Sequence, residues 1–400
     1  MLEQLEGSAA VAAVVARCRP AVVCAYPITP QTHIVEALSR MVASGSLEGC
    51  EFINVESEFA AMSVAIGASA TGARAYTATA SQGLLYMAEA LYNAAGLGLP
   101  VVMTVANRAI GAPINIWNDH SDSMSQRDCG WLQLFAEDNQ QAVDLHAQAF
   151  RIAEELSLPV MVCMDGFVLT HAYEQVEVPT AEQIDAFLPP FQPRQVLDPQ
   201  APLTIGAMVG PEAFTEVRYL AHEAHRRALD LIPEIGRRYE QATGHSGAQL
   251  LTTYRASDAD TLVVALGSVL GTLKDVVDVR RDDGHRVGLI GVTSYRPFPA
   301  TALRAAVGAA SRIVVIERSL APGSGETVTT DVRSALAGTD IELHTVVAGL
   351  GGRPIRAASL GEMLEAASAG TLPALSFLDL DRDSLKAQLH STPLLVGDLP

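Results

Sequence analysis

The chain has 400 residues, of which 49% are hydrophobic and 18% are charged, and its formal net charge at pH 7 is −18. This acidic balance argues against nucleic acids and anionic membranes as partners, because both are polyanions. The length exceeds what one hydrophobic core usually serves, so two or three domains are expected.

The sequence predicts a soluble, cytoplasmic protein. No apolar run reaches the roughly 18 residues that span a bilayer, and Glu3 and Glu6 stand where a secretory signal needs positive charge. The cysteines are scattered and form no C-x-x-C pair, so we do not expect this chain alone to hold an iron–sulfur cluster or a zinc ribbon. Buried free thiols are expected instead.

The first part of the chain alternates short apolar runs with helical patterns. Predicted strands cover residues 21–26, 75–78, 99–106 and 159–164, and predicted helices cover residues 8–17, 31–42 and 140–156. This alternation is typical of a parallel sheet with crossover helices. Residues 1–178 are therefore expected to form one α/β domain.

Residues 51–83 carry the most informative pattern of this domain. An apolar run that reads as a buried strand is followed by Glu56 and Glu58 and then by a helix rich in alanine and glycine. Carboxylates at the carboxyl end of a parallel strand face the crevice where ligands of open α/β sheets bind. For Glu58 the alternative is a first-turn acid that stabilises its helix through the macrodipole by about 0.3–1 kcal/mol.

Thr29 lies between two prolines that restrict the backbone around its hydroxyl. This arrangement suits ligand binding, and it equally suits capping of the helix that follows.

Residues 107–128 form a long polar connection after a predicted strand, and such connections are usually functional or disordered. Arg108 begins it. A structural ion pair with Asp119 or Asp122 is the alternative to ligand binding by Arg108. His120 lies among acids in the same loop but shows no metal-ligand spacing.

The second part of the chain predicts a linker and another α/β domain. Prolines cluster between residues 179 and 202, so residues 179–259 are expected to be a linker that contains a long helix at 212–243. Strands at 261–266, 287–291, 313–316 and 341–346 alternate with helices and predict a second parallel sheet within residues 260–370. Residues 371–400 are expected to form a tail that packs on a partner. The predicted fold class is α/β with two parallel-sheet modules.

Five segments occur in the order typical of one family. They are Tyr26–Pro30 (YPITP), Ser57–Glu58, Thr79–Leu84 (TASQGL), the loop that runs from Asn107 to Asp128 (NRAIGAPINIWNDHSDSMSQRD) and Tyr295–Pro299 (YRPFP). Over about residues 15–350 the chain resembles the α subunit of 2-oxoacid:ferredoxin oxidoreductases, pyruvate:ferredoxin oxidoreductase in particular. The resemblance implies a thiamine diphosphate pyrimidine-binding domain followed by a transketolase C-terminal-like domain.

The resemblance also implies roles for individual residues. Glu58 would be catalytic, because its carboxyl would hydrogen-bond the pyrimidine ring of the coenzyme and promote removal of the thiazolium C2 proton. Its neighbour Glu56 matches the family pattern less well. Arg108 would bind the substrate carboxylate, and Thr29 would hydrogen-bond the carboxylate or the keto oxygen of the substrate. The coenzyme would further contact Pro27, Ser81 and Gln82.

By the same resemblance, the chain needs partner subunits. A diphosphate-binding domain would carry a G-D-G string with downstream asparagines for Mg²⁺, and the nearest strings here, Asp282–Gly284 and Met164–Gly166, lack them. The diphosphate and Mg²⁺ would therefore sit on a β subunit, and the iron–sulfur clusters on partner subunits that include γ and ferredoxin-like δ chains.

The implied reaction is oxidative decarboxylation of a pyruvate-like 2-oxoacid with coenzyme A to acyl-CoA and CO₂, with electrons passing to iron–sulfur clusters and ferredoxin. The scaffold could instead act on an arylglyoxylate, a branched-chain 2-oxoacid or oxalate. A 2-oxoacid dehydrogenase or transketolase subunit, and a scaffold subunit without chemistry, are further alternatives.

Overall fold

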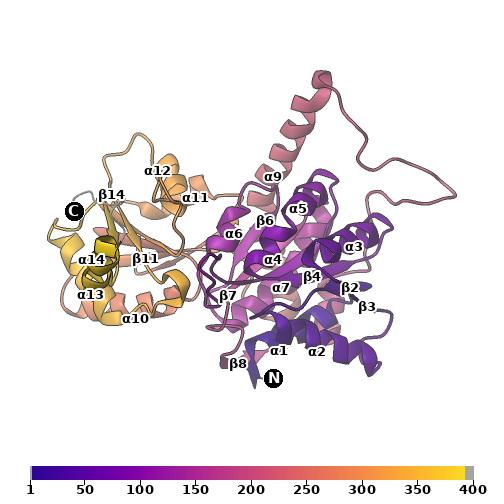
Figure 1. Cartoon of the computed structure of the whole chain (residues 1–400), viewed down its shortest axis with the longest axis horizontal. Helices are drawn as coiled ribbons and strands as arrows, with labels where there is room; N and C mark the ends of the chain where they lie inside the picture. Colours follow the sequence, from indigo (N-terminus) through magenta and orange to yellow (C-terminus); the bar gives the residue numbers. More distant parts are fainter. Residues whose placement is uncertain (1, 392–400) are drawn as a thin grey trace.

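The computed structural model describes residues 2–391, which form two α/β lobes, each built around its own sheet (Figure 1). None of the helices in this described part is both long and apolar enough to cross a membrane. The two lobes confirm the predicted α/β fold class, with the additions of antiparallel edge strands given below.

The sheet of the first lobe has seven strands in the order β12-β6-β7-β5-β4-β2-β3. All neighbours are parallel except β12, which adds antiparallel to β6. The central strands β4, β5 and β7 are buried along their whole length, whereas β3 is a half-buried edge strand rather than the buried strand expected. The strands are β2 (Val22–Ala25), β3 (Glu51–Asn54), β4 (Ala75–Thr79), β5 (Val102–Asn107), β6 (Leu132–Phe135), β7 (Val160–Asp165) and β12 (Ser294–Arg296).

Helices cover both faces of this sheet, which is why its central strands read as continuous apolar runs. One core joins α1, α2 and α7 to one face, and a second core joins α3, α4 and α5 to the other. A two-stranded antiparallel ribbon, β1 (Leu2–Glu6) with β8 (Tyr173–Glu177), lies beside α1 and α7. The helices are α1 (Gly7–Arg17), α2 (Thr32–Ala43), α3 (Glu58–Ala70), α4 (Ser81–Tyr86), α5 (Ala88–Gly96), α6 (Ser121–Ser125) and α7 (Asn139–Leu156).

The sheet of the second lobe has six strands in the order β15-β14-β13-β10-β11-β9, parallel except for the edge strand β9. Because β15 pairs with β14, this sheet extends beyond residue 370 into the segment expected to be a tail. The strands are β9 (Leu251–Tyr254), β10 (Thr261–Ala265), β11 (Val287–Val292), β13 (Arg312–Glu317), β14 (Glu342–Val347) and β15 (Leu375–Phe377). The helical elements are α10 (Val269–Asp282), α11 (Ala300–Val307), α12 (Val328–Ala335), η1 (Leu350–Gly352), α13 (Ala357–Ser368) and α14 (Arg382–Ser391), and residues 392–400 of the expected tail lie outside the described residues.

The connection between the lobes contains two helices, α8 (Ala181–Phe187) and α9 (Pro211–Thr243). Helix α8 was not predicted, although a capping box between Thr180 and Gln183 marks its start. The second half of α9 packs on α7 and α8, whereas its first half is mostly exposed and projects from the lobe (Figure 1).

Candidate active site

The carboxyl ends of the parallel strands of the first sheet bring the candidate site residues to one edge. Thr79 ends β4, Arg108 directly follows β5, and Thr29 and Glu58 lie in the connections that follow β2 and β3. This is the edge at which open α/β sheets bind ligands.

Glu58 is the first residue of α3, behind the N-cap Ser57, whose hydroxyl accepts a hydrogen bond from the Ala60 amide. Its side chain is buried, with 8% of the residue exposed, whereas Glu56 is exposed. Among the described residues, no hydrogen bond or ion pair satisfies the Glu58 carboxyl group. A buried carboxyl without a protein partner is costly, so this position favours a ligand that supplies the partner.

Because Gly83 has no side chain, the Glu58 carboxyl can reach the turn between β4 and α4. A Cβ atom at Gly83 would lie 2.7 Å from Glu58 Oε1 and 2.5 Å from Thr79 Oγ1, so only glycine leaves room for both side chains. The Thr79 hydroxyl is buried and has no hydrogen-bond partner within the described chain. Two polar groups that lack partners thus face the same glycine.

Asp122 of α6 holds this turn against the end of β5. Its Oδ2 atom accepts hydrogen bonds from the backbone amides of Ser81 and Arg108, each at 2.9 Å. Its Oδ1 atom accepts from the Asn107 side-chain amide at 2.8 Å and from the Ser123 backbone amide at 2.7 Å. Burial raises the pKa of Asp122 to about 7, and these hydrogen bonds oppose the rise.

Arg108 and Thr29 are in direct contact, although not through the Thr29 hydroxyl. The guanidinium of Arg108 donates to the backbone carbonyls of Thr29 at 3.0 Å and Asn115 at 3.1 Å. The alternative ion pairs with Asp119 and Asp122 are not formed, because the side chains of both acids accept hydrogen bonds from backbone amides instead. Burial lowers the pKa of Arg108, and the charge of Asp122 opposes this effect.

Thr29 does not cap the next helix, so that alternative role is wrong. The N-cap position of α2 belongs to Gln31, whose side chain donates instead to the Tyr26 carbonyl. Thr29 itself is exposed.

The remaining predicted site residues, Ser81, Gln82 and Pro27, differ in their contacts at this edge of the sheet. The hydroxyl of Ser81 donates to the Ala109 carbonyl at 2.5 Å and also contacts the side chain of Gln82. Gln82 in turn lies against Gly111 of the long loop. Pro27 is exposed near the end of β2. Thus Ser81, Gln82, Arg108 and Thr29 are linked by contacts that run through the long loop.

Asp165 is the last residue of β7, and its side chain joins the two lobes. No role was predicted for it from the sequence. Its carboxylate lies 2.8 Å from Nε2 of His120, accepts from the backbone amide of Ser268 at 2.9 Å, and contacts the guanidinium of Arg318. Burial is the largest single influence on the pKa of Asp165 and would raise it, but the guanidinium of Arg318, His120 and the hydrogen bond from Ser268 together outweigh burial and hold this pKa well below its usual range. His120 is therefore part of a buried interlobe network.

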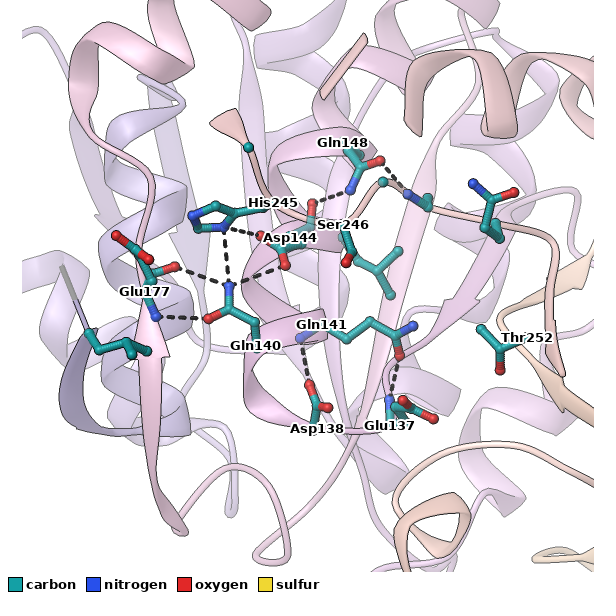
Figure 2. Close-up of a pocket in the computed structure, with 16 residues that line it drawn as sticks. Glu137, Asp138, Gln140, Gln141, Asp144, Gln148, Glu177, His245, Ser246 and Thr252 are labelled. Carbon is teal, nitrogen blue, oxygen red and sulfur yellow. Dashed lines mark hydrogen bonds and ion pairs between the residues drawn. The ribbon is translucent and has the colours of Figure 1, made fainter. Parts of the chain in front are cut away.

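A separate polar cavity of about 560 Å³ lies between α7 and residues 244–252 (Figure 2). Its central carboxylate, Asp144, accepts from Tyr239 at 2.7 Å and from Gln140 at 3.1 Å, and lies 2.9 Å from Nδ1 of His245. This hydrogen bond from His245 to Asp144 raises the pKa of His245. The network fastens the end of α9 to α7 and does not include Glu58.

All five cysteines are buried and free, as expected. Asp122, Thr79 and Gly83 were not singled out as site residues. Thr79 and Gly83 belong to the TASQGL string, so the sequence contained a signal for them. The role of Asp122 depends on its contacts with the backbone at Ser81 and Arg108, which spacing in the sequence does not reveal.

Comparisons with known proteins identify the family to which the chain belongs. Residues 13–237 match the family described as "Pyruvate flavodoxin/ferredoxin oxidoreductase, thiamine diP-bdg", and residues 259–360 match "Pyruvate:ferredoxin oxidoreductase core domain II". The pyruvate synthase subunit PorA of Methanosarcina barkeri is 47% identical over 95% of this chain and 97% of its own length. The ketoisovalerate oxidoreductase subunit VorA of Pyrococcus horikoshii is 39% identical over 87% of this chain and 89% of its own length.

Among solved structures, a 2-oxoglutarate:ferredoxin oxidoreductase from Magnetococcus marinus has the same fold, with a TM-score of 0.75 at 17% identity. The match covers 91% of this chain and 65% of that one, so the chain spans less than two thirds of that structure's length. From the two matched families and the high identity to PorA, the chain belongs to the pyruvate flavodoxin/ferredoxin oxidoreductase family, as an α subunit of a 2-oxoacid:ferredoxin oxidoreductase.

Proposed function

We propose that this chain supplies the pyrimidine-binding half of a thiamine diphosphate site and binds the carboxylate of a pyruvate-like 2-oxoacid. The overall reaction converts the 2-oxoacid and coenzyme A to acyl-CoA and CO₂. Its two electrons leave through iron–sulfur clusters on partner subunits to ferredoxin. The observation that carries the proposal is a buried, unpaired carboxyl group, Glu58, at the ligand-binding edge of the sheet.

The residues around Glu58 fit an aminopyrimidine ring. The Thr79 hydroxyl is buried without a hydrogen-bond partner among the described residues, the Glu58 carboxyl forms no hydrogen bond to them, and Gly83 leaves the space between the two groups open. A ring with nitrogen donors and acceptors would satisfy both groups at once. When bound, thiamine diphosphate supplies the carbanion that attacks the 2-oxo group. Glu58 would hydrogen-bond the ring nitrogen, and its burial excludes water that would compete for that hydrogen bond.

Arg108 is the proposed carboxylate-binding residue. It is 6% exposed and forms no ion pair with an acid among the described residues, and part of its guanidinium contacts the carbonyls of Thr29 and Asn115. Those contacts fix the plane of the guanidinium and leave its other N–H groups free for a carboxylate. A substrate carboxylate would also neutralise a buried charge, which favours binding. Thr29, exposed beside it, would donate its hydroxyl to the same substrate.

The diphosphate and Mg²⁺ are proposed to lie on a β subunit. Within the Met164–Gly166 string, Asp165 already accepts from Ser268 and Arg318 and faces His120, so it does not fit a metal ion. Exposed aromatic side chains lie on α3, α4 and α5, namely Phe59, which directly follows Glu58, Tyr86, whose ring lies 6.3 Å from that of Phe59, and Tyr92. An apolar surface of this kind is typical of a protein interface, which would also exclude water from Glu58.

The following assignments are also part of this proposal. They are the contacts of Pro27, Ser81 and Gln82 with the coenzyme, γ and δ partner subunits, a cytoplasmic location, and the division into domains 1–178, 179–259, 260–370 and 371–400.

Pyruvate is the proposed substrate, because several relatives at 42–47% identity are named pyruvate synthase subunits. A branched-chain 2-oxoacid is the second candidate, since subunits of ketoisovalerate oxidoreductases are 39% identical.

The test is steady-state turnover of the purified complex with pyruvate, 2-oxoisovalerate, 2-oxoglutarate and phenylglyoxylate, each with and without coenzyme A. We expect the highest kcat/KM with pyruvate and ferredoxin reduction that requires coenzyme A. A parallel complex carrying Glu58→Gln is expected to lose turnover with every substrate. Full activity of that variant would contradict the proposed role of Glu58, and a preference for another 2-oxoacid would correct only the substrate.

A further inference from the structure

Three side chains with metal-binding donors converge away from the candidate active site. They are Glu6 at the end of β1, His33 in the first turn of α2 and His171 just before β8, and one donor atom from each lies within 4.8 Å of the others. From this convergence we propose a binding site for a divalent transition-metal ion, Zn²⁺ above all, which nothing in the proposed reaction requires.

The donor set suits such an ion. Two imidazoles and one carboxylate are ligands that Zn²⁺, Co²⁺ and Ni²⁺ accept, and three protein ligands leave a coordination position open. Bonds of about 2.0–2.2 Å place the donors of one ion roughly 3–4 Å apart. Nδ1 of His33 already lies 2.7 Å from Oε1 of Glu6. The side chain of His33 is 49% exposed, so it is free to move by the distance needed to admit an ion.

The backbone around two of the donors is fixed before any ion binds. Glu6 faces Tyr173 in the β1–β8 ladder. The amides of Gly7 and Ser8 donate to the carbonyls of Ala172 and Thr170, at 3.0 and 2.9 Å. These bonds hold Glu6 and His171 at a set separation, and a preorganised donor pair loses little entropy when an ion binds.

His171 is oriented for coordination through one nitrogen. Its Nδ1 atom lies 2.8 Å from Oγ1 of Thr170, and that hydroxyl also accepts from the Phe167 amide at 2.8 Å. Ligating histidines commonly engage their second nitrogen in such a hydrogen bond, which sets the ring orientation. Nε2 is therefore the nitrogen of His171 that remains for the ion.

A simple ion pair does not account for the cluster. The contact between His33 and Glu6 involves one imidazole, yet the rings of His33 and His171 stack with centroids 4.6 Å apart. The ion pair therefore accounts for Glu6 and His33 but not for the close approach of His171, whereas one bound ion would use all three donors.

The site connects physically to the long loop. The ring of His171 contacts Phe167 at 4.8 Å between centroids, and Phe167 contacts Trp117 at 4.7 Å. The backbone carbonyl of Trp117 accepts a hydrogen bond from the Ala109 amide at 3.0 Å. An ion at Glu6, His33 and His171 would therefore tie β1, α2 and the turn before β8 to the loop that begins at Arg108, and Trp117 offers a spectroscopic reporter.

The experiment uses the full-length chain after treatment with a chelator, and isothermal titration with ZnCl₂. We expect one Zn²⁺ per chain at this site. His33→Ala, His171→Ala and Glu6→Gln should each weaken binding at least tenfold, because each removes one ligand. His222→Ala, which removes an exposed histidine of α9, is the matched control and should bind as the parent does. Equal Zn²⁺ affinity in the parent and in His33→Ala or His171→Ala would overturn the proposal.

Two further readouts separate metal binding from misfolding. Zn²⁺ should raise the melting temperature of the parent but not of His33→Ala, whose side chain is half exposed and whose metal-free melting temperature should match the parent's. Titration with Ni²⁺ or Co²⁺ should quench the tryptophan fluorescence of the parent, and this quenching should disappear in His171→Ala and in Trp117→Phe. Quenching that persists in His171→Ala would contradict the assignment.

Discussion

At the scale of single residues, the candidate site is defined by two buried ionisable groups without an ion-pair partner in the described part of the chain. Glu58 forms no hydrogen bond or ion pair with the described residues, and the guanidinium of Arg108 donates to the backbone carbonyls of Thr29 and Asn115. Buried charged groups are normally paired, because the loss of hydration is otherwise uncompensated. Their unpaired state is therefore best explained by ligands that complete the site.

Replacement of Arg108 tests this view at the substrate end. Arg108→Ala is expected to lower kcat/KM for the 2-oxoacid, because the substrate carboxylate would be buried without a partner. The decrease should correspond to a loss of about 2–4 kcal/mol in transition-state stabilisation. Arg108→Lys should recover part of this loss, since it keeps the charge but not the planar pair of donors. Steady-state kinetics of the complex measures the effect.

The control for Arg108 is Arg40→Ala, which removes an exposed arginine of α2 that forms an exposed ion pair with Glu36. It should leave kcat/KM unchanged. If Arg108→Ala also left kcat/KM unchanged, the carboxylate-binding role would be wrong.

At the scale of elements, the turn from β4 into α4 sets the position of Glu58. Gly83→Ala would place a Cβ atom 2.7 Å from Glu58 Oε1, so the carboxyl must move away from the coenzyme site. We expect turnover of the complex to fall at least tenfold. Gly271→Ala in α10 is the matched control, because its added Cβ meets no atom within 4 Å. Equal turnover in the two variants would show that the position of Glu58 does not matter.

A second element-scale prediction concerns the packing of α7 on β5. His146 of α7 is fully buried, with Nε2 2.5 Å from Oγ1 of Thr104 and Nδ1 2.6 Å from the Ala142 carbonyl. Burial lowers the pKa of His146 to about 4. Because the unfolded chain binds this proton near pH 6.5 and the folded chain does not, stability should fall as pH decreases from about 6.5 to 4.

The variant His146→Gln isolates this contribution. The free energy of unfolding of the parent should fall more steeply over this pH range than that of His146→Gln, by on the order of a few kcal/mol in total. Denaturant unfolding at a series of pH values measures both. Parallel pH profiles would contradict the buried, neutral state of His146.

Sequence patterns predicted most of the longer elements but missed the three-residue strands, for a physical reason. The apolar positions of α9 recur with helical spacing over many turns, and β5 and β7 are continuous apolar runs between helices. In contrast, β12 and β15 span three residues each and exist only because a neighbouring strand offers its edge. A run that short has no periodicity from which to predict it.

At the scale of the whole molecule, Asp165 joins the lobes. It lies 103 residues from Ser268 and 153 from Arg318 along the chain, so no spacing pattern could have indicated their contact. The edge that carries Glu58 and Arg108 was predictable, because it follows from strand order, whereas the network behind it depends on how the two sheets dock. β12 adds to this docking, since it follows β11 in the chain yet extends the first sheet.

Breaking this network should destabilise the assembled fold. Arg318→Ala leaves the Asp165 carboxylate buried without its cationic partner, and a cost of about 3–5 kcal/mol in unfolding free energy is expected. Arg333→Ala removes an arginine from an ion pair with Glu326 in which the arginine is 56% exposed, and should cost at most about 1 kcal/mol. Denaturant melts of the two variants compare them, and equal losses would remove the special role assigned to Asp165.

The most direct test of the account is a structure of the complete complex with thiamine diphosphate bound. We predict that the Glu58 carboxyl lies within hydrogen-bond distance of the pyrimidine ring and that residues of a second subunit hold the diphosphate and Mg²⁺. A structure in which Glu58 faces bulk solvent, or in which one subunit other than this chain encloses the whole coenzyme, would contradict it.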